Sequence, residues 1–109
     1  MKYTQEMIDK LIVVEDGKRY IRDINFYNCD LSELDMSNIT FQNCIVLKTN
    51  LRGTNLRGAN LYYSTLKDIK LDWTYLGENN LDSIIINEYS HFTDAILPEK
   101  YEYLRKGKK

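Results

Sequence analysis

The chain has 109 residues, of which 28% are charged, and a formal net charge of −1. This length suits a single domain, and the lack of an apolar run of about 18 residues argues against a membrane-spanning segment. Glu6, Asp9 and Lys10 interrupt the apolar core that a signal peptide would need, so we expect a cytoplasmic protein.

Residues 1–22 are predicted to form an N-terminal cap made of a helix and a hairpin. Apolar residues recur at helical spacing between Thr4, a favourable N-cap, and Ile12. Two β-type segments then flank Asp16-Gly17, a pair typical of hairpin turns because glycine readily adopts positive φ. We expect this unit to cover the first turn of the structure that follows.

Residues 23–97 are dominated by an apolar residue at every fifth position. A period of five is neither the 3.6 of an α-helix nor the 2 of a strand. It therefore predicts a chain that turns once per repeat and returns each apolar side chain to a common interior. These central residues are Phe26, Leu31, Met36, Phe41, Val46, Leu51, Leu56, Leu61, Leu66, Leu71, Leu76, Leu81 and Ile86.

The positions before each central residue complete the pattern. Two places before it (minus-two), most residues are small or apolar, and one place before it (minus-one), many are Asn or Asp, which bond to nearby backbone. The stretch 49–61, TNLRGTNLRGANL, shows this most cleanly. The chain thus resembles the pentapeptide-repeat family, whose motif is a small residue, Asp or Asn, Leu or Phe, and two variable positions. The resemblance covers about residues 22–97.

The resemblance implies an all-β solenoid, a right-handed quadrilateral β-helix in which four pentapeptides make one coil. Central and minus-two side chains would point inward and the other three outward. Coils of about 20 residues stack at about 4.8 Å, so the repeat body would hold about 3.5 coils. Because each coil buries little by itself, both ends need caps.

His91 falls, by this register, on a position where leucine is expected. A histidine can serve as a ligand or a general base, but the sequence has no second one. We interpret His91 as a sign that the register slips, with Ala95 and Leu97 forming a minus-two and central pair displaced by one residue. The last turn is therefore expected to be irregular.

Residues 98–109 are predicted to form a C-terminal helix and a basic tail. Pro98 suits the first turn of a helix, and Leu97, Tyr101 and Leu104 share one face. This face either covers the last coil or forms the seam of a homodimer, and both alternatives remain open.

The two cysteines, Cys29 and Cys44, both occupy minus-two positions, where a small apolar group is favoured. We read them as buried reduced thiols rather than as a disulfide or a metal site, because metal-binding His partners are missing nearby. No metal or cofactor is expected.

The repeat body is acidic, with ten Asp and Glu against five Lys and Arg. In a 20-residue coil, Asp30, Glu33 and Asp35 lie beneath uncharged residues of the next coil. This uncompensated carboxylate cluster is a candidate protein-binding patch, and the alternative is ordinary solvated surface charge.

Two charge ladders are expected in the next coils. Lys48 would stack with Asp68, and Arg52 with Asp72, because the members of each pair are 20 residues apart. Such exposed pairs add little stability but cancel local charge.

Aromatic side chains form a second candidate protein-binding surface. Tyr62, Tyr63, Trp73 and Tyr75 point outward in the predicted register, and Arg57 is expected to join Tyr75 at one corner. Outward Trp and Tyr are enriched at recognition surfaces. The alternative is that these large side chains only shield the edges of the coils.

Catalysis is disfavoured, and we expect no enzyme. A square coil filled by Leu and Phe has no interior cleft, and its outward carboxylates diverge over four faces instead of opposing one another. The sequence contains no Gly-rich phosphate loop, nucleophile elbow or zinc spacing.

We therefore expect a binding module that occludes a site on another protein. The resemblance extends this to inhibitors of DNA-handling enzymes such as gyrase, which imitate the charge of duplex DNA. A compact chain of this kind could equally be a phage-encoded antagonist of a host nuclease or defence complex, such as an anti-CRISPR. The alternative is a self-associating structural scaffold. Direct nucleic-acid binding through the tail from Arg105 to Lys109 is a third hypothesis, which the acidic body disfavours.

Overall fold

The structure is a computed structural model that describes residues 1–71 and 73–106 of the chain. Asp72, the expected partner of Arg52, and the tail residues 107–109 lie outside the described residues. No helix in the described part is long and apolar enough to cross a membrane. The elements are α1 (Gln5–Leu11), β1 (Val13–Glu15), β2 (Lys18–Arg22), β3 (Asn25–Tyr27), β4 (Ile39–Gln42), β5 (Ile45–Leu47), β6 (Thr65–Lys67) and the 3₁₀-helix η1 (Glu99–Lys106).

The N-terminal segment contains the predicted helix and hairpin. Thr4 is the N-cap of α1, and its hydroxyl accepts a hydrogen bond from the Met7 amide at 3.2 Å. Strands β1 and β2 pair antiparallel across Asp16 and Gly17, whose φ values of 52° and 75° are both left-handed. Ile8 of α1 is fully buried in the same core as the repeat body.

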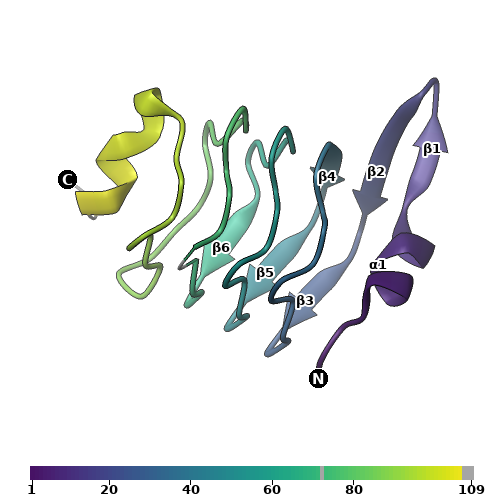
Figure 1. The fold of residues 1–109 in the computed structure, drawn as a ribbon, viewed down its shortest axis with the longest axis horizontal. Coiled ribbons are helices and arrows are strands. Elements are labelled where there is room, and N and C mark those ends of the chain that lie inside the picture. Colours follow the sequence, from purple (N-terminus) through teal and green to yellow (C-terminus); the bar gives the residue numbers. More distant parts are fainter. Residues whose placement is uncertain (72, 107–109) are drawn as a thin grey trace.

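The repeat body winds with 20 residues per turn. Parallel pairing joins β2 to β4, and β3 to β5 to β6, with Ile45 opposite Thr65 as one example of the spacing. Within the described part of the body, only these short segments form strands (Figure 1). Isolated parallel bridges such as Asp30 with Asn50 continue the same register on the other walls. Parallel crossover connections of this kind are right-handed as a rule. The body is therefore a β-helix.

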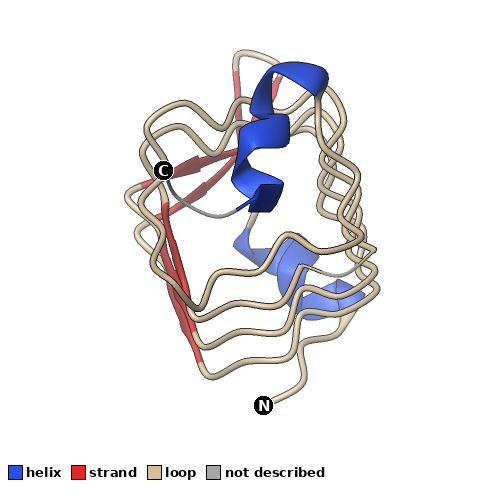
Figure 2. Cartoon of the chain, turned by 90° about the vertical axis from the view of Figure 1, so that its left-hand side faces the viewer, coloured by secondary structure: helices blue, strands red, loops and turns tan. Residues whose placement is uncertain are grey.

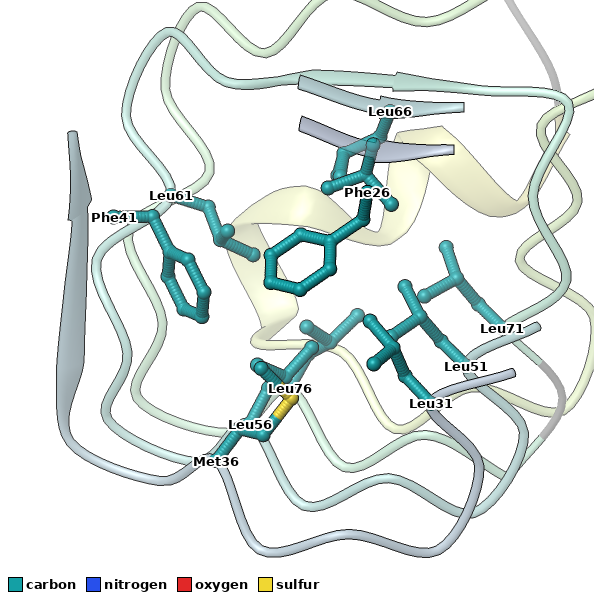
Figure 3. Close-up of a pocket in the computed structure, with 11 residues that line it drawn as sticks. Phe26, Leu31, Met36, Phe41, Leu51, Leu56, Leu61, Leu66, Leu71 and Leu76 are labelled. Atoms are coloured by element: carbon teal, nitrogen blue, oxygen red, sulfur yellow. The ribbon is translucent and has the colours of Figure 1, made fainter. Parts of the chain in front are cut away.

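The central side chains from Phe26 to Leu76 point inward and form four stacks (Figure 3). Leu81 is buried in the same core, whereas Ile86 is only partly buried. We call the wall built by β3, β5 and β6 the first face, and the walls whose central residues include Leu51, Leu56 and Leu61 the second, third and fourth faces. The space left between the stacks is only about 20 Å³, and central side chains line it. The interior is thus apolar and closely packed.

Minus-two side chains add a polar ladder inside the wall. The Thr54 hydroxyl donates to the Leu31 carbonyl oxygen, 23 residues earlier, at 2.8 Å, and the Asn79 side-chain amide donates to the Leu56 oxygen at 2.7 Å. These bonds satisfy hydroxyl and amide groups that are otherwise buried. The side-chain oxygen of Asn79 has no hydrogen-bond partner among the residues that the structure describes.

Each regular corner turns through a residue of positive φ, two places after the central residue. Glycine serves at Gly53 and Gly58, both with φ of 70°, whereas Glu33 and Trp73 adopt φ of 60° and 62°. The minus-one side chain supports the turn, as where Asn50 Oδ1 accepts from the backbone amide two residues later at 3.0 Å. The predicted bonding of minus-one residues to nearby backbone is therefore confirmed.

The register slips by one residue before His91. Thr65 lies opposite Ile85, 20 residues away, but Lys70 lies opposite His91, 21 residues away. Phe92, only 2% exposed, takes the central position, while His91 is exposed at minus-one. Ala95 and Leu97 are buried as the displaced minus-two and central pair, so the predicted slip is confirmed.

The helix η1 crosses the C-terminal end of the body (Figures 1 and 2). Leu97, Tyr101 and Leu104 are buried in the common core. The Tyr101 hydroxyl donates to Asp82 at 2.7 Å, and Arg105 donates to backbone carbonyl oxygens of the last coil at 2.9 and 3.1 Å. These side chains are therefore packed against their own chain.

Candidate protein-binding surfaces

The acidic patch consists of Asp30, Glu33 and Asp35. Asp30 accepts hydrogen bonds from the amide and hydroxyl of Ser32 at 2.9 and 2.6 Å, and Asp35 accepts from those of Ser37 at 3.1 and 2.7 Å. These bonds, the side-chain ones first, hold the pKa of both carboxyl groups below its ordinary value. Both groups are therefore ionised at neutral pH.

The expectation that this patch is uncompensated is wrong for Asp30. Lys2 lies 3.6 Å from its carboxylate, because the first residues of the chain run alongside the second face. The positive charge of Arg19 also contributes to the lowered pKa of Asp35. Both cations come from outside the repeat body, where the five-residue period gives no information about spatial neighbours.

Glu33 and Trp73 share one corner, with Gly53 between them. The Glu33 side chain lies under Gly53, within 3.1 Å of the place a Cβ would occupy, and Trp73 follows one coil later. Trp73 is 63% exposed and borders a groove of about 340 Å³. We call this the Trp73 groove, lined by Ser32, Glu33, Asn50, Arg52, Gly53 and Trp73.

The acidic patch and the aromatic surface therefore meet, although the sequence treats them as separate features. The sequence does contain a signal for this proximity, because Glu33, Gly53 and Trp73 are spaced 20 residues apart and therefore stack at one corner. Arg52 in the same groove is the residue that sequence reasoning left out of the site. One carboxylate, one guanidinium and one indole ring thus border a single depression.

Tyr62 and Tyr63 lie at a different corner, between the fourth and first faces. Their ring centroids are 6.1 Å apart, and both rings are exposed. They border a second groove of about 480 Å³ together with the exposed side chains of Ile45 and Ile85. The four predicted aromatic residues therefore do not form one surface.

Arg57 and Tyr75 come together as predicted, at the corner after the third face. The Arg57 guanidinium lies 5.9 Å from the centroid of the Tyr75 ring and 3.1 Å from the Glu78 carboxylate. The Tyr75 ring covers Gly77, where an added Cβ would approach it to 2.8 Å. Arg57 is thus already paired within the chain, and Tyr75 is only partly exposed.

The predicted ladder between Lys48 and Asp68 does not form an ion pair among the residues that the structure describes. Asp68 instead accepts a hydrogen bond from the Asn87 side chain at 3.0 Å, and Lys48 lies 5.8 Å from the centroid of the Tyr27 ring. Asn87 belongs to the irregular turn before His91, so the register slip supplies this competing partner.

Cys29 and Cys44 are both free thiols. Cys44 is buried, and this burial raises the pKa of its thiol, whereas Cys29 is partly exposed. Within residues 1–71 and 73–106, no three His, Cys, Asp or Glu side chains form a group that could hold a metal ion.

Comparisons with known proteins agree with the repeat architecture. A family model described as "Pentapeptide repeats" matches residues 48–76 in 8 copies. No curated protein sequence matches the chain.

Three solved structures are similar to the chain. Rfr23, a pentapeptide repeat protein from the cyanobacterium Cyanothece 51142, is 24% identical, with 72% of this chain and 65% of that one covered and a TM-score of 0.46. HetL, a pentapeptide repeat protein involved in heterocyst differentiation regulation from Nostoc sp. strain PCC 7120, is 19% identical, with 66% and 38% covered and a TM-score of 0.32. QnrB1, a plasmid-mediated fluoroquinolone resistance protein, is 11% identical, with 72% and 71% covered and a TM-score of 0.32.

The chain therefore spans 65% of the length of Rfr23 and 38% of that of HetL. The family model thus matches residues 48–76 to pentapeptide repeats, and the five-residue pattern and the 20-residue turn continue on both sides of that match.

Proposed function

We propose that this protein is a non-enzymatic binding module that occludes a site on another protein through its outer walls. The observation that carries the proposal is the Trp73 groove, where a large ring stays exposed at a corner although apolar side chains fill the interior. Pentapeptide-repeat proteins are generally structural or binding proteins, which supports the same role.

The groove is built to bind without reorganising. Trp73 is held at a left-handed corner, and its backbone amide donates to the Asp94 carbonyl oxygen of the next coil at 3.1 Å. An exposed indole on a fixed backbone loses little conformational entropy on binding and contributes strongly when a partner covers it. Glu33 and Arg52 beside it supply one charge of each sign for orientation.

The experiment compares Trp73→Ala with Tyr89→Ala as bait in affinity capture from a cell lysate, with mass spectrometry as the readout. Tyr89 is a matched control because it is 58% exposed but lies outside the groove. We expect a protein that is enriched by the wild type and by Tyr89→Ala, and lost with Trp73→Ala. Equal capture by all three baits, or capture of nothing but the protein itself, would contradict the proposal.

For the partner we propose a nucleic-acid-processing enzyme or nucleoprotein complex that the module inhibits by charge mimicry. Acidic side chains occur at all four corners, with Asp23, Glu33, Asp68 and Glu78 as examples. A surface of this kind attracts a basic site that normally holds nucleic acid. Reversing the charges of the acidic patch should weaken capture of the partner, and raising the salt concentration should do the same.

We further propose that residues 1–22 and 98–109 close the ends of a body of about 3.5 coils, residues 23–97. Burial of Leu97, Tyr101 and Leu104 under the chain itself favours the closing role over a homodimer seam. A cytoplasmic location agrees with two free thiols. Sedimentation over a hundredfold concentration range tests the self-associating alternative, which requires a dimer that Tyr101→Ala abolishes.

A further inference from the structure

The N-terminal end of a β-helix presents unpaired backbone groups on every face. Hydrogen bonds between coils show which groups these are: the amide and carbonyl of the minus-one residue both point toward the preceding coil. Ile85, for example, donates to Ser64 O at 2.9 Å and accepts from Leu66 N at 2.8 Å. The carbonyl of the residue after the central one points the same way, as Leu47 O shows by accepting from Asn28 N at 2.9 Å.

On the second face, the first residues of the chain satisfy all three groups. The Asp30 amide donates to Met1 O at 2.7 Å, and Asp30 O accepts from Tyr3 N at 3.0 Å. The third group, Ser32 O, accepts from the Lys2 ammonium at 2.7 Å. Residues 1–3 therefore act as an added parallel strand.

On the third face, side chains form hydrogen bonds with the equivalent backbone groups, and on the fourth face a strand does. The Gln5 side chain accepts from Asp35 N and donates to Asp35 O, both at 2.8 Å, while Arg19 donates to Ser37 O at 3.1 Å. On the fourth face β1 pairs with the outer edge of β2. The outer backbone groups of three faces are thus paired, by residues 1–3 on the second face, by side chains on the third and by β1 on the fourth.

The first face lacks such a device among the described residues. Strand β3 pairs only with β5, and the equivalent groups are Asn25 N–H, Asn25 C=O and Tyr27 C=O. The described residues provide no hydrogen bond to either group of Asn25, and Tyr27 O has only the Cys29 thiol at 3.2 Å. This edge begins a parallel sheet that β5, β6 and Ile85 continue.

We propose that the free edge of β3 binds an extended, basic segment of the partner protein as an additional parallel strand. The segment would offer a carbonyl to Asn25 N–H, an amide two residues later to Asn25 C=O, and a lysine or arginine side chain to Tyr27 C=O, as residues 1–3 do on the second face. This inference rests on the proposed function and names a second contact of the module.

Charge complementarity selects a basic segment. Two of the three edge groups, Asn25 C=O and Tyr27 C=O, are acceptors, and the second has only the weak thiol donor of Cys29. Asp23, whose carboxylate accepts from Asn43 at 2.8 Å, lies just before the strand. The Tyr27 ring, 59% exposed, already has the Lys48 ammonium 5.8 Å from its centroid, and it can in the same way cover the aliphatic stem of a partner's lysine or arginine. Backbone pairing gives affinity, and these side chains give selectivity.

The first test is amide hydrogen exchange of the isolated protein by NMR. We expect the Asn25 amide to exchange at least a hundredfold faster than the amides of Ile45 and Thr65, which occupy the same position one and two coils later. Protection of Asn25 equal to that of Ile45 would overturn the proposal, because the edge would already be covered.

The second test uses a library of random heptapeptides displayed on phage, selected against the purified protein and then synthesised. Asn25→Pro removes the free N–H without removing an internal hydrogen bond of the described residues, and a proline is tolerated at the first residue of an edge strand. We expect selected peptides rich in Lys and Arg, whose affinity falls at least tenfold in Asn25→Pro and stays within twofold in Asn25→Ala.

A measurement on the wild type does not depend on whether Asn25→Pro folds correctly. If the peptide binds at this edge, it should slow exchange of the Asn25 amide. The edge site would be overturned if the selected peptides bound Asn25→Pro as tightly as the wild type and did not slow exchange of the Asn25 amide. If they depended on Trp73 instead, the proposed function would survive while this inference failed. A wild-type dimer in sedimentation that Asn25→Pro abolishes would also overturn it, in favour of a second copy as the occupant.

Discussion

The Ser90 hydroxyl donates to the carbonyl oxygen of Leu66 at 2.6 Å across 24 residues, whereas the equivalent bond from Thr54 to Leu31 spans 23. Ser90 is therefore a minus-two residue that has moved by one place. The extra residue is absorbed in the outer turn before Ser90, so the polar ladder inside the wall continues across the slip.

The shifted register makes opposite predictions for His91 and Phe92. Phe92→Ala should lower the free energy of unfolding by about 3 kcal/mol, because it empties a central position, whereas exposed His91→Ala should change it by less than about 0.5 kcal/mol. Urea unfolding followed by circular dichroism measures both. A larger loss for His91→Ala would mean that the register does not slip.

The polar ladder predicts a cost for Thr54→Val. The valine keeps the shape of the side chain but leaves the buried Leu31 oxygen without its hydroxyl donor, so we expect a loss of about 1 to 2 kcal/mol. Thr65→Val on the outer side of β6 is the matched control and should be neutral or slightly stabilising, because valine favours strands. Equal effects of the two substitutions in thermal unfolding would contradict this role of the hydroxyl.

Two glycines with the same φ of 70° separate backbone strain from steric contact. Gly53→Ala meets only the flexible Glu33 side chain and should cost about 1 kcal/mol, the usual penalty of a left-handed residue. Gly58→Ala also collides with the side-chain oxygen of Asn38, which should add about 1 kcal/mol or more.

The added cost of Gly58→Ala should shrink when Asn38 is replaced as well. The double variant Asn38→Ala/Gly58→Ala, compared with each single variant, measures the coupling by urea unfolding. Strict additivity would show that the contact with Asn38 is not the cause.

Acid unfolding should report the serine bonds to the acidic patch. Because the folded pKa values of Asp30 and Asp35 lie below the unfolded ones, their contribution is fully present above an unfolded pKa of about 3.9 and is lost as the pH falls through the folded values. Ser32→Ala/Ser37→Ala should therefore be less stable than the wild type at pH 6. The difference should shrink toward pH 2, and a constant difference across this range would contradict the mechanism.

The repeat body could be predicted from the sequence because one constraint recurs. Each central residue from Phe26 to Leu81 is buried, and pairing of residues 20 apart follows from the period. The slip was also visible, since Ala95 and Leu97 repeat the pattern one place late. The predicted contact of Arg57 with Tyr75 relied on the same arithmetic.

The contacts of the two ends could not be predicted in this way. Lys2 beside Asp30, and the Gln5 side chain on the Asp35 backbone, depend on where a non-repeating segment crosses the first coil. The distribution of the aromatic residues over separate corners is a different case. It follows from the period but requires each corner to be followed through successive coils.

The one-residue slip before His91 also bears on how such chains diversify. The extra residue lies in an outer turn, and Phe92 and Leu97 again occupy buried central positions. A solenoid of this kind can therefore gain a residue at a corner without disturbing its core. The family match ends at residue 76, although the five-residue spacing holds as far as Ile86 and the winding goes on to Leu97.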